Sequence, residues 1–84
     1  MRVLITGAGG MIGQKLAKAL AARGQMRGKS IDGMWLHDLT APPGVQGLAC
    51  HSLQGDLRAP EVAAELAALN CDVVFHLAGV VSAQ

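Results

Sequence analysis

The sequence predicts an α/β fold in which helices cover both faces of a doubly wound parallel sheet. An apolar run at residues 2–6 leads directly into a glycine-rich turn, and a helical pattern follows at once. A near-continuous apolar run at residues 72–78 is typical of a parallel strand that is buried on both faces. Between these runs the pattern predicts two more strands and a second helix, so the whole order is β-α-β-β-α-β. Right-handed crossovers then give the strand order 3-2-1-4.

The glycine-rich turn reads GAGGMIG over residues 7–13. Gly7 allows a sharp turn out of the strand, Gly10 allows the backbone to approach a pyrophosphate, and Gly13 allows the helix to pack closely on the strand. The first helical turn presents N–H groups without intrahelical partners, and the helix dipole adds to their attraction for an anion. Strand, turn and helix together predict a Rossmann-like site for the diphosphate of a dinucleotide. The alternative is a flexible turn in a chain that contains 11 glycines.

An amphipathic helix of about three turns follows this motif and ends at Gly24. Its predicted buried face consists of Ile12, Leu16, Ala19 and Leu20. Residues 25–30 are polar, and we expect a surface loop there. The Gly-Lys-Ser within this loop lacks the upstream glycine of a phosphate-binding P-loop, because position 23 is arginine.

Asp38 follows the second predicted strand, residues 33–37. A carboxylate at the tip of this strand can accept hydrogen bonds from both hydroxyls of an adenine ribose, and it repels a 2′-phosphate. The next residue is Leu39, where a cofactor with a 2′-phosphate favours a basic side chain. The pattern therefore favours NAD over NADP as the cofactor. The alternative for Asp38 is a plain turn residue, since turn-forming residues follow it.

A weaker third strand at residues 48–53 precedes Asp56 and Leu57. The Asp56 carboxylate could accept a hydrogen bond from an adenine amino group, with Leu57 beneath the ring. A turn or helix-capping aspartate is the alternative, and spacing alone does not separate the two. The next helix begins at Pro60 and ends at Asn70. Its predicted buried stripe consists of Val62, Leu66 and Leu69.

Composition limits the class of protein. The 84 residues leave room for one domain, and the net charge of +1 does not indicate a broad nucleic-acid surface. Cys50 and Cys71 predict no disulfide framework, which favours a reducing, cytoplasmic setting. No segment approaches the roughly 20 apolar residues of a membrane helix, and the start does not resemble a signal peptide. We therefore expect neither a nucleic-acid partner nor a membrane partner.

The histidines predict no metal site, because His37, His51 and His76 lack metal-ligand spacing with either cysteine. His76 lies within the last apolar strand, and we expect it to be a hydrogen-bonded core histidine. No Ser-His-Asp arrangement emerges from the sequence. We therefore predict no catalytic residue in this chain.

Separated motifs, in the right order, resemble the extended short-chain dehydrogenase/reductase superfamily, which includes NAD-dependent epimerases and dehydratases. The motifs are TGAGGMIG at residues 6–13, Asp38, GDL at 55–57 and DVVFHLAG at 72–79. The resemblance implies that the pyrophosphate is bound by Gly7, Gly10, Met11, Ile12 and Gly13. It implies that Asp38 holds the adenine ribose and that Asp56 and Leu57 frame the adenine. It places beside the ribose Leu77, Ala78 and Gly79. It also brings Ser82 to the nicotinamide or the substrate.

Further stretches of the sequence resemble one branch of the superfamily, whose NAD-dependent members oxidise a secondary alcohol on a four-carbon sugar acid. These stretches are residues 1–17, Ser30-Ile31-Asp32, Pro42-Pro43 and residues 75–84. The resemblance implies a small-molecule sugar-acid substrate and a homodimeric parent enzyme. A sugar-nucleotide epimerase or dehydratase and a non-catalytic dinucleotide sensor are the alternatives. The superfamily's chemistry uses a Tyr-x-x-x-Lys pair, and this sequence contains no tyrosine. We therefore expect residues 1–84 to be the N-terminal part of a dinucleotide-binding domain, without the substrate lobe and inactive alone.

Overall fold

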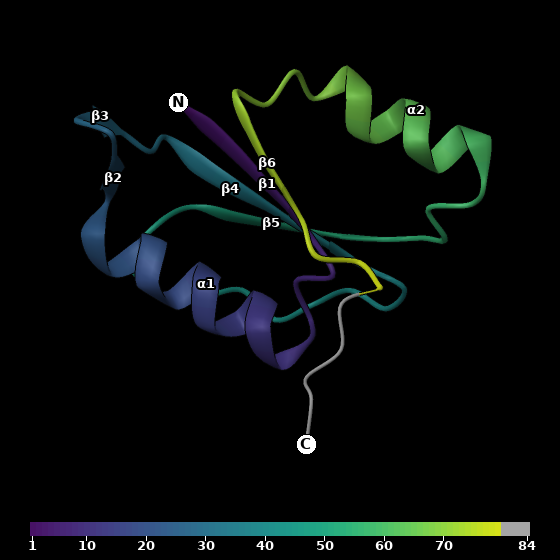
Figure 1. Cartoon of the computed structure of the whole chain (residues 1–84), viewed down its shortest axis with the longest axis horizontal. Coiled ribbons are helices and arrows are strands. Elements are labelled where there is room, and N and C mark those ends of the chain that lie inside the picture. Colours follow the sequence, from purple (N-terminus) through teal and green to yellow (C-terminus); the bar gives the residue numbers. More distant parts are fainter. Residues whose placement is uncertain (80–84) are drawn as a thin grey trace.

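The computed structural model describes residues 1–79, which form a parallel sheet with one helix on each face (Figure 1). The sheet contains four strands in the order β5-β4-β1-β6, so the predicted order 3-2-1-4 is confirmed. Its strands are β1 (Arg2–Thr6), β4 (Gly33–Asp38), β5 (Cys50–Gln54) and β6 (Val73–His76). The helices are α1 (Met11–Arg23) and α2 (Pro60–Ala68). The remaining strands, β2 (Gln25–Met26) and β3 (Lys29–Ser30), form a separate pair.

The hydrophobic core lies between the sheet and α1. The register aligns Val3 with Met34 and Ile5 with Leu36, and all four side chains are fully buried. From α1 the core receives Gly13, Ala17, Leu20 and Ala21. Of the predicted face, Leu20 is buried and Leu16 packs partly buried against the core, whereas Ile12 and Ala19 are exposed. The buried face is therefore centred about one position further along the helix than predicted. The reason is that small residues four apart allow α1 to approach the sheet more closely than a row of larger side chains does.

The opposite face of the sheet is covered less completely, by α2. No residue of α2 is fully buried, and the predicted stripe of Val62, Leu66 and Leu69 is only half-buried. The prediction that the last strand is buried on both faces was also wrong, because β6 alternates between half-buried and exposed and Val74 is 54% exposed. Within residues 1–79, β6 pairs with β1 alone and forms an edge of the sheet.

Residues 25–30 form a hairpin where a surface loop was expected. Gln25 pairs with Ser30 and Met26 with Lys29 in antiparallel register. Arg27 and Gly28 both have left-handed φ values, 53° and 78°, which is the geometry of a tight two-residue hairpin turn. Apart from the half-buried Met26, its residues are exposed and show no apolar alternation, so the sequence pattern does not reveal the hairpin. The segment nevertheless lies at the surface, as expected.

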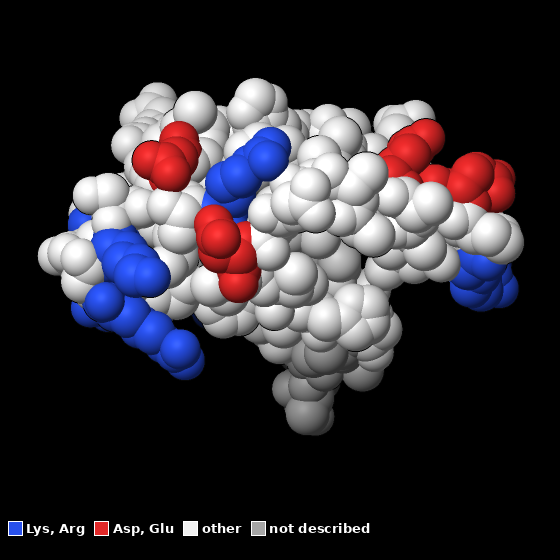
Figure 2. Space-filling model, turned by 90° about the horizontal axis from the view of Figure 1, so that it is seen from above, with Lys and Arg blue, Asp and Glu red and all other residues white. Residues whose placement is uncertain are grey.

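Figure 2 shows several basic side chains gathered toward one end of the face in view, acidic side chains beside them and at the opposite end, and uncharged surface over most of the rest. This distribution agrees with the net charge of +1. Among the residues that the structure describes, neither helix has the length and apolar content needed to cross a bilayer.

Candidate dinucleotide-binding site

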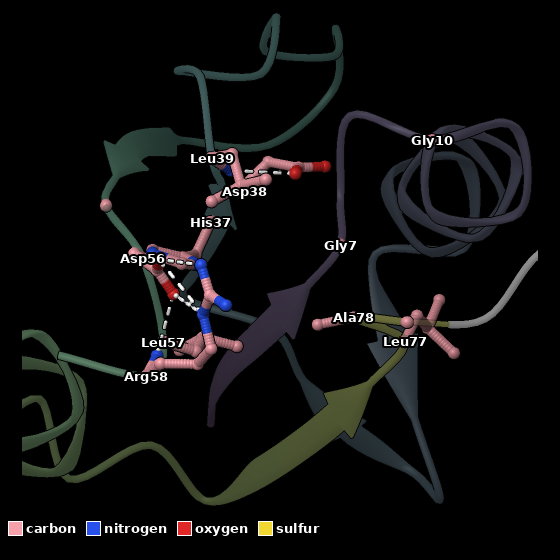
Figure 3. Close-up of a pocket in the computed structure, with 12 residues that line it drawn as sticks. Gly7, Gly10, His37, Asp38, Leu39, Asp56, Leu57, Arg58, Leu77 and Ala78 are labelled. Atoms are coloured by element: carbon pink, nitrogen blue, oxygen red, sulfur yellow. Dashed lines mark hydrogen bonds and ion pairs between the residues drawn. The ribbon is translucent and has the colours of Figure 1, made fainter.

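A cleft of about 480 Å³ opens at the carboxyl ends of the sheet strands (Figure 3). It brings together eight of the residues predicted to bind the cofactor: Gly7, Gly10, Asp38, Asp56, Leu57, Leu77, Ala78 and Gly79. Its lining also includes four residues that sequence reasoning did not select: His37, Leu39, Gly55 and Arg58. Met11, Ile12 and Gly13 lie outside the lining, and Ser82 lies outside the described residues.

The chain leaves β1 through Gly7, whose φ is 72°. A Cβ at this position would lie 2.8 Å from the backbone nitrogen of Ala78 and the same distance from the backbone carbon of Leu77. Both the left-handed conformation and the close contact require glycine. The turn thus brings the glycine loop directly against the segment that follows β6.

Gly10 and Gly13 have different environments, although both are glycines of the same sequence motif. A Cβ on Gly10 would meet only the Gly7 carbonyl oxygen, at 3.5 Å, and otherwise open space in the cleft. Gly10 is also the N-cap of α1 and provides no side-chain cap, so the first-turn N–H groups remain available to an anion. A Cβ on Gly13 would lie 2.5 Å from the Gly7 carbonyl oxygen and 2.7 Å from the Cα of Ala8. Gly13 is therefore required by packing between α1 and the loop, whereas Gly10 leaves room for a ligand.

Met11 and Ile12 lie in the first turn of α1 with exposed side chains, 60% and 41% respectively. Neither side chain lines the cleft. Any contribution of these residues to anion binding therefore comes from their backbone N–H groups, as a helix N-terminus offers.

Asp38 is the last residue of β4, and its carboxylate is fixed at the edge of the glycine loop. Oδ2 accepts a hydrogen bond from the Gly9 N–H at 2.8 Å, and Oδ1 accepts one from the Leu39 N–H at 2.7 Å. A Cβ on Gly9 would lie 2.9 Å from the same Oδ2. A side chain at Gly9 would therefore displace the Asp38 carboxylate, a role for this glycine that sequence reasoning missed. The feature of the sequence that could have indicated this role is the aspartate at the end of the neighbouring strand, which lies across from Gly9.

Asp56 and Arg58 form an exposed pair at the other end of the cleft (Figure 3). The Asp56 Oδ1 accepts a hydrogen bond from the Arg58 N–H at 2.9 Å, and Oδ2 accepts one from the guanidinium at 2.8 Å. These hydrogen bonds lower the pKa of Asp56 to about 2. The carboxylate is therefore ionised at neutral pH and can only accept hydrogen bonds.

Thr6 connects β1 to the segment beyond β6. Its backbone oxygen accepts a hydrogen bond from the Leu77 N–H at 3.0 Å, and its hydroxyl oxygen accepts one from the Ala78 N–H at 3.4 Å. The hydroxyl also lies 2.7 Å from Nδ1 of His76. These contacts hold Leu77 and Ala78 at the cleft. The prediction for His76 was right about its hydrogen bond and wrong about its burial, because the residue is exposed on the edge strand.

No cluster of three or more histidine, cysteine or acidic side chains among residues 1–79 is arranged to hold a metal ion. The polar groups that line the cleft are backbone amides of the glycine loop, two carboxylates, one guanidinium and one imidazole. This set suits a ligand with phosphate, hydroxyl and heterocyclic groups.

A comparison with models of protein families identifies the family of this chain. Residues 3–84 match the model of the NAD dependent epimerase/dehydratase family. The chain belongs to this family. The cofactor of the family is NAD, as predicted, and the geometry fits it: the space beside Gly10 is open and the Asp38 carboxylate is fixed beside the glycine loop.

Similar curated proteins include two D-erythronate dehydrogenases. The chain is 38% identical to the one from Cupriavidus necator over 91 residues and 37% identical to the one from Haemophilus influenzae over 87 residues. Each match covers 100% of this chain, but only 27% and 26% of the relatives. The chain thus spans about a quarter of the length of these curated relatives.

A solved structure also resembles the chain. The crystal structure of a nucleoside-diphosphate-sugar epimerase from Agrobacterium tumefaciens matches with a TM-score of 0.89 and 38% sequence identity. The match covers 98% of this chain and 25% of that protein. The similarity supports the assignment of a Rossmann-like fold.

Proposed function

We propose that this chain is the NAD-binding portion of an oxidoreductase that oxidises a secondary alcohol of a sugar acid similar to D-erythronate. Family membership supports an NAD-dependent oxidoreductase. The sugar-acid substrate is proposed from the names of the two curated relatives at 38% and 37% identity. Of the residues to which we assign a role below, we propose that Ser82 alone approaches the substrate, or else the nicotinamide.

The position of Asp38 carries the cofactor assignment. Its carboxylate is held by the Gly9 and Leu39 amides, so it is already oriented before a ligand binds. Two free ribose hydroxyls can donate to such a carboxylate, whereas the 2′-phosphate of NADP would be repelled by it. The neighbouring Leu39 offers no positive charge to compensate. We therefore propose that Asp38 selects NAD.

The other assignments follow the length of the cleft. Gly7, Gly10 and the N-terminus of α1 would bind the pyrophosphate, and Asp56 with Leu57 would frame the adenine. Leu77, Ala78 and Gly79 would lie beside the ribose. Ser82 would approach the nicotinamide or the substrate. When bound, NAD supplies the acceptor for a hydride from the alcohol.

No proton-transfer residue is assigned to this chain, because the tyrosine that the superfamily uses as acid/base is absent from its sequence. We propose that this chain alone binds the cofactor without turning over. The free thiols Cys50 and Cys71 support the further proposal of a cytoplasmic location. A homodimeric parent enzyme is carried over from the resemblance.

A sugar-nucleotide epimerase is the second candidate, and one observation favours it. The solved structure that resembles this chain, at 38% identity, is described as a nucleoside-diphosphate-sugar epimerase. The glycine loop and cofactor cleft of this chain would serve a dehydrogenase or an epimerase equally. The two candidates differ in whether NADH accumulates.

The cofactor assignment is tested by calorimetric titration of this chain with NAD and NADP. We expect NAD to bind more tightly, and Asp38→Asn to weaken NAD binding while narrowing the difference from NADP. Equal binding of both cofactors by the wild-type chain would contradict the proposal.

The reaction is tested with the whole enzyme of which we propose this chain to be the NAD-binding portion, and the D-erythronate dehydrogenase from Cupriavidus necator is the control relative. A dehydrogenase forms NADH in proportion to the D-erythronate consumed. An epimerase leaves the NAD pool unchanged and interconverts nucleotide sugars. The second result, with the control relative active, would overturn the dehydrogenase assignment.

A further inference from the structure

His37 is a buried polar residue that lacks a partner. Its side chain is only 2% exposed, and neither Nδ1 nor Nε2 has a hydrogen-bond partner among the residues that the structure describes. A neutral imidazole carries one donor and one acceptor, and burying such a group without a partner destabilises a fold. A leucine at this position would avoid that penalty, so packing alone does not account for the histidine.

The surroundings of His37 on the sheet are mostly apolar. In the register of the sheet it lies between Thr6 of β1 and Leu53 of β5. On the side of α2 it lines a cavity of about 230 Å³ together with Leu53, Gln54, Val62, Glu65, Leu66 and Leu69. The Thr6 hydroxyl is already engaged by His76, at 2.7 Å. The polar side chain paired with His37 in the register of β1 therefore has another partner.

His37 also lines the main cleft, where it lies between Asp38 and Asp56 (Figure 3). This position is on the side of the cleft away from Gly10. The proposed ribose contact and the proposed adenine contact lie on either side of it. His37 thus belongs to the wall of the part of the cleft that we assign to a heterocyclic base, and both of its ring nitrogens are unused.

We propose that His37 hydrogen-bonds the adenine base of the bound nucleotide and is a specificity-determining residue of this cleft. The inference rests on the proposed function, since it takes the NAD-binding cleft as given. It adds a contact that the glycine motif and the acidic positions do not contain.

The chemistry of the neighbours supports adenine as the partner. Adenine presents an amino donor and several ring-nitrogen acceptors. The ionised Asp56 carboxylate can only accept, and the Arg58 guanidinium is engaged by that carboxylate. The Arg58 side chain is also 90% exposed, so neither of these two side chains fixes a donor for a ring nitrogen in the wall of the cleft. The His37 N–H supplies that donor.

The test compares nucleotide binding with stability in His37→Leu. We expect the Kd for ADP to rise about three- to tenfold, as expected for the loss of one neutral hydrogen bond. We expect the melting temperature without nucleotide to stay the same or rise, because the leucine removes an unpartnered polar group from an apolar site. These opposite directions separate a ligand contact from a purely structural role.

Two controls make the test specific. His51→Leu is the same chemical change on the neighbouring strand, where His51 stacks on Trp35 with ring centroids 4.7 Å apart, and it should leave the Kd for ADP unchanged. His37→Leu should leave binding of inorganic pyrophosphate unchanged, because pyrophosphate has no base. Of His37→Asn and His37→Gln, the variant whose amide matches the nitrogen that contacts adenine should recover most of the affinity.

Several results would overturn the inference. An unchanged Kd for ADP in His37→Leu would mean that the imidazole pairs with water only. An equal loss for ADP and pyrophosphate would mean that the substitution acts through the glycine loop. Both results leave NAD binding by the wild-type chain intact, so the proposed function would survive. A wild-type chain that binds neither ADP nor NAD would overturn both.

Discussion

The structure of the glycine loop predicts that a methyl group added at Gly10 weakens ligand binding but has little effect on stability. In Gly10→Ala the new Cβ would meet only the Gly7 oxygen at 3.5 Å, and the φ of Gly10 is −77°, which alanine adopts freely. We therefore expect the free energy of unfolding to change by no more than about 0.5–1 kcal/mol. The same methyl group occupies the space that a pyrophosphate needs. Overpacking of this kind costs about 1–3 kcal/mol, which corresponds to an increase of about 5- to 140-fold in the Kd for NAD.

Gly13→Ala is the matched control, because the same change is made three residues away at a packed site. Its Cβ would lie 2.5 Å from the Gly7 oxygen and 2.7 Å from the Cα of Ala8, and backbone atoms cannot move aside cheaply. Overpacking near the upper limit of about 3 kcal/mol, offset by about 1 kcal/mol of helix propensity, gives a net loss of about 2 kcal/mol.

The two variants are compared by urea unfolding and by NAD titration of the folded fraction. The structure predicts that Gly10→Ala loses affinity at nearly constant stability, whereas Gly13→Ala loses stability first. Tight NAD binding by a folded Gly10→Ala chain would refute the reasoning, because the open space beside Gly10 would then serve no ligand.

Other substitutions test separate parts of the cleft. Asp38→Asn should raise the Kd for NAD about 10- to 100-fold, as expected when hydrogen bonds to a charged group are lost, and calorimetry against NADP checks the change in preference. Arg58→Ala should return the pKa of Asp56 from about 2 toward its ordinary 3.8, which a carbon-13 NMR titration measures. Because a lowered pKa stabilises the fold above the ordinary value, wild-type stability should fall as the pH drops from about 4 to about 2, and Arg58→Ala should lose this dependence in acid unfolding. Thr6→Val removes the hydroxyl that contacts His76 and Ala78, and should destabilise the chain by about 0.5–1.5 kcal/mol and accelerate exchange of the Ala78 amide proton. An unchanged exchange rate would contradict the role assigned to that hydroxyl.

The strand order could be predicted from the sequence because strong local signals determine it. A glycine turn marks the end of β1, an apolar run marks β6, and right-handed crossovers leave few arrangements for the strands between them. The cleft was predictable for the same reason, since parallel strands bring their carboxyl ends to one edge. Asp38 and Asp56 follow neighbouring strands, and both line the cleft.

The features that could not be predicted from the sequence depend on contacts between residues far apart in the chain or on close packing, and hydrophobic periodicity identifies neither. The buried face of α1 was misjudged because Gly13 and Ala17 are too small to register as an apolar stripe, yet their size permits the close approach. The role of Gly9 depends on an aspartate 29 residues away, and that of Arg58 on a carboxylate that the sequence assigns to a ligand. His37 was considered only as a metal ligand, because burial without a partner becomes visible only in the folded chain.

On the α2 face of the sheet, a cluster of stabilising contacts and the cleft lie at opposite ends of the strands. At the amino ends, the Arg2 guanidinium lies 4.3 Å from the centre of the Trp35 ring, and His51 stacks on the other side of the same row. Arg2 also donates to the Leu69 oxygen at 2.7 Å, so this cluster connects β1, β4 and β5 to the end of α2. At the carboxyl ends the corresponding row contains Thr6, whose hydroxyl contacts His76, and His37, which lines the cleft. Because this cluster lies at the far end of the strands, its contacts involve neither the His37 imidazole nor the glycine loop. Trp35→Leu should accordingly lower stability without changing the Kd for ADP of the folded chain, and a change in that Kd would show that the two ends are coupled.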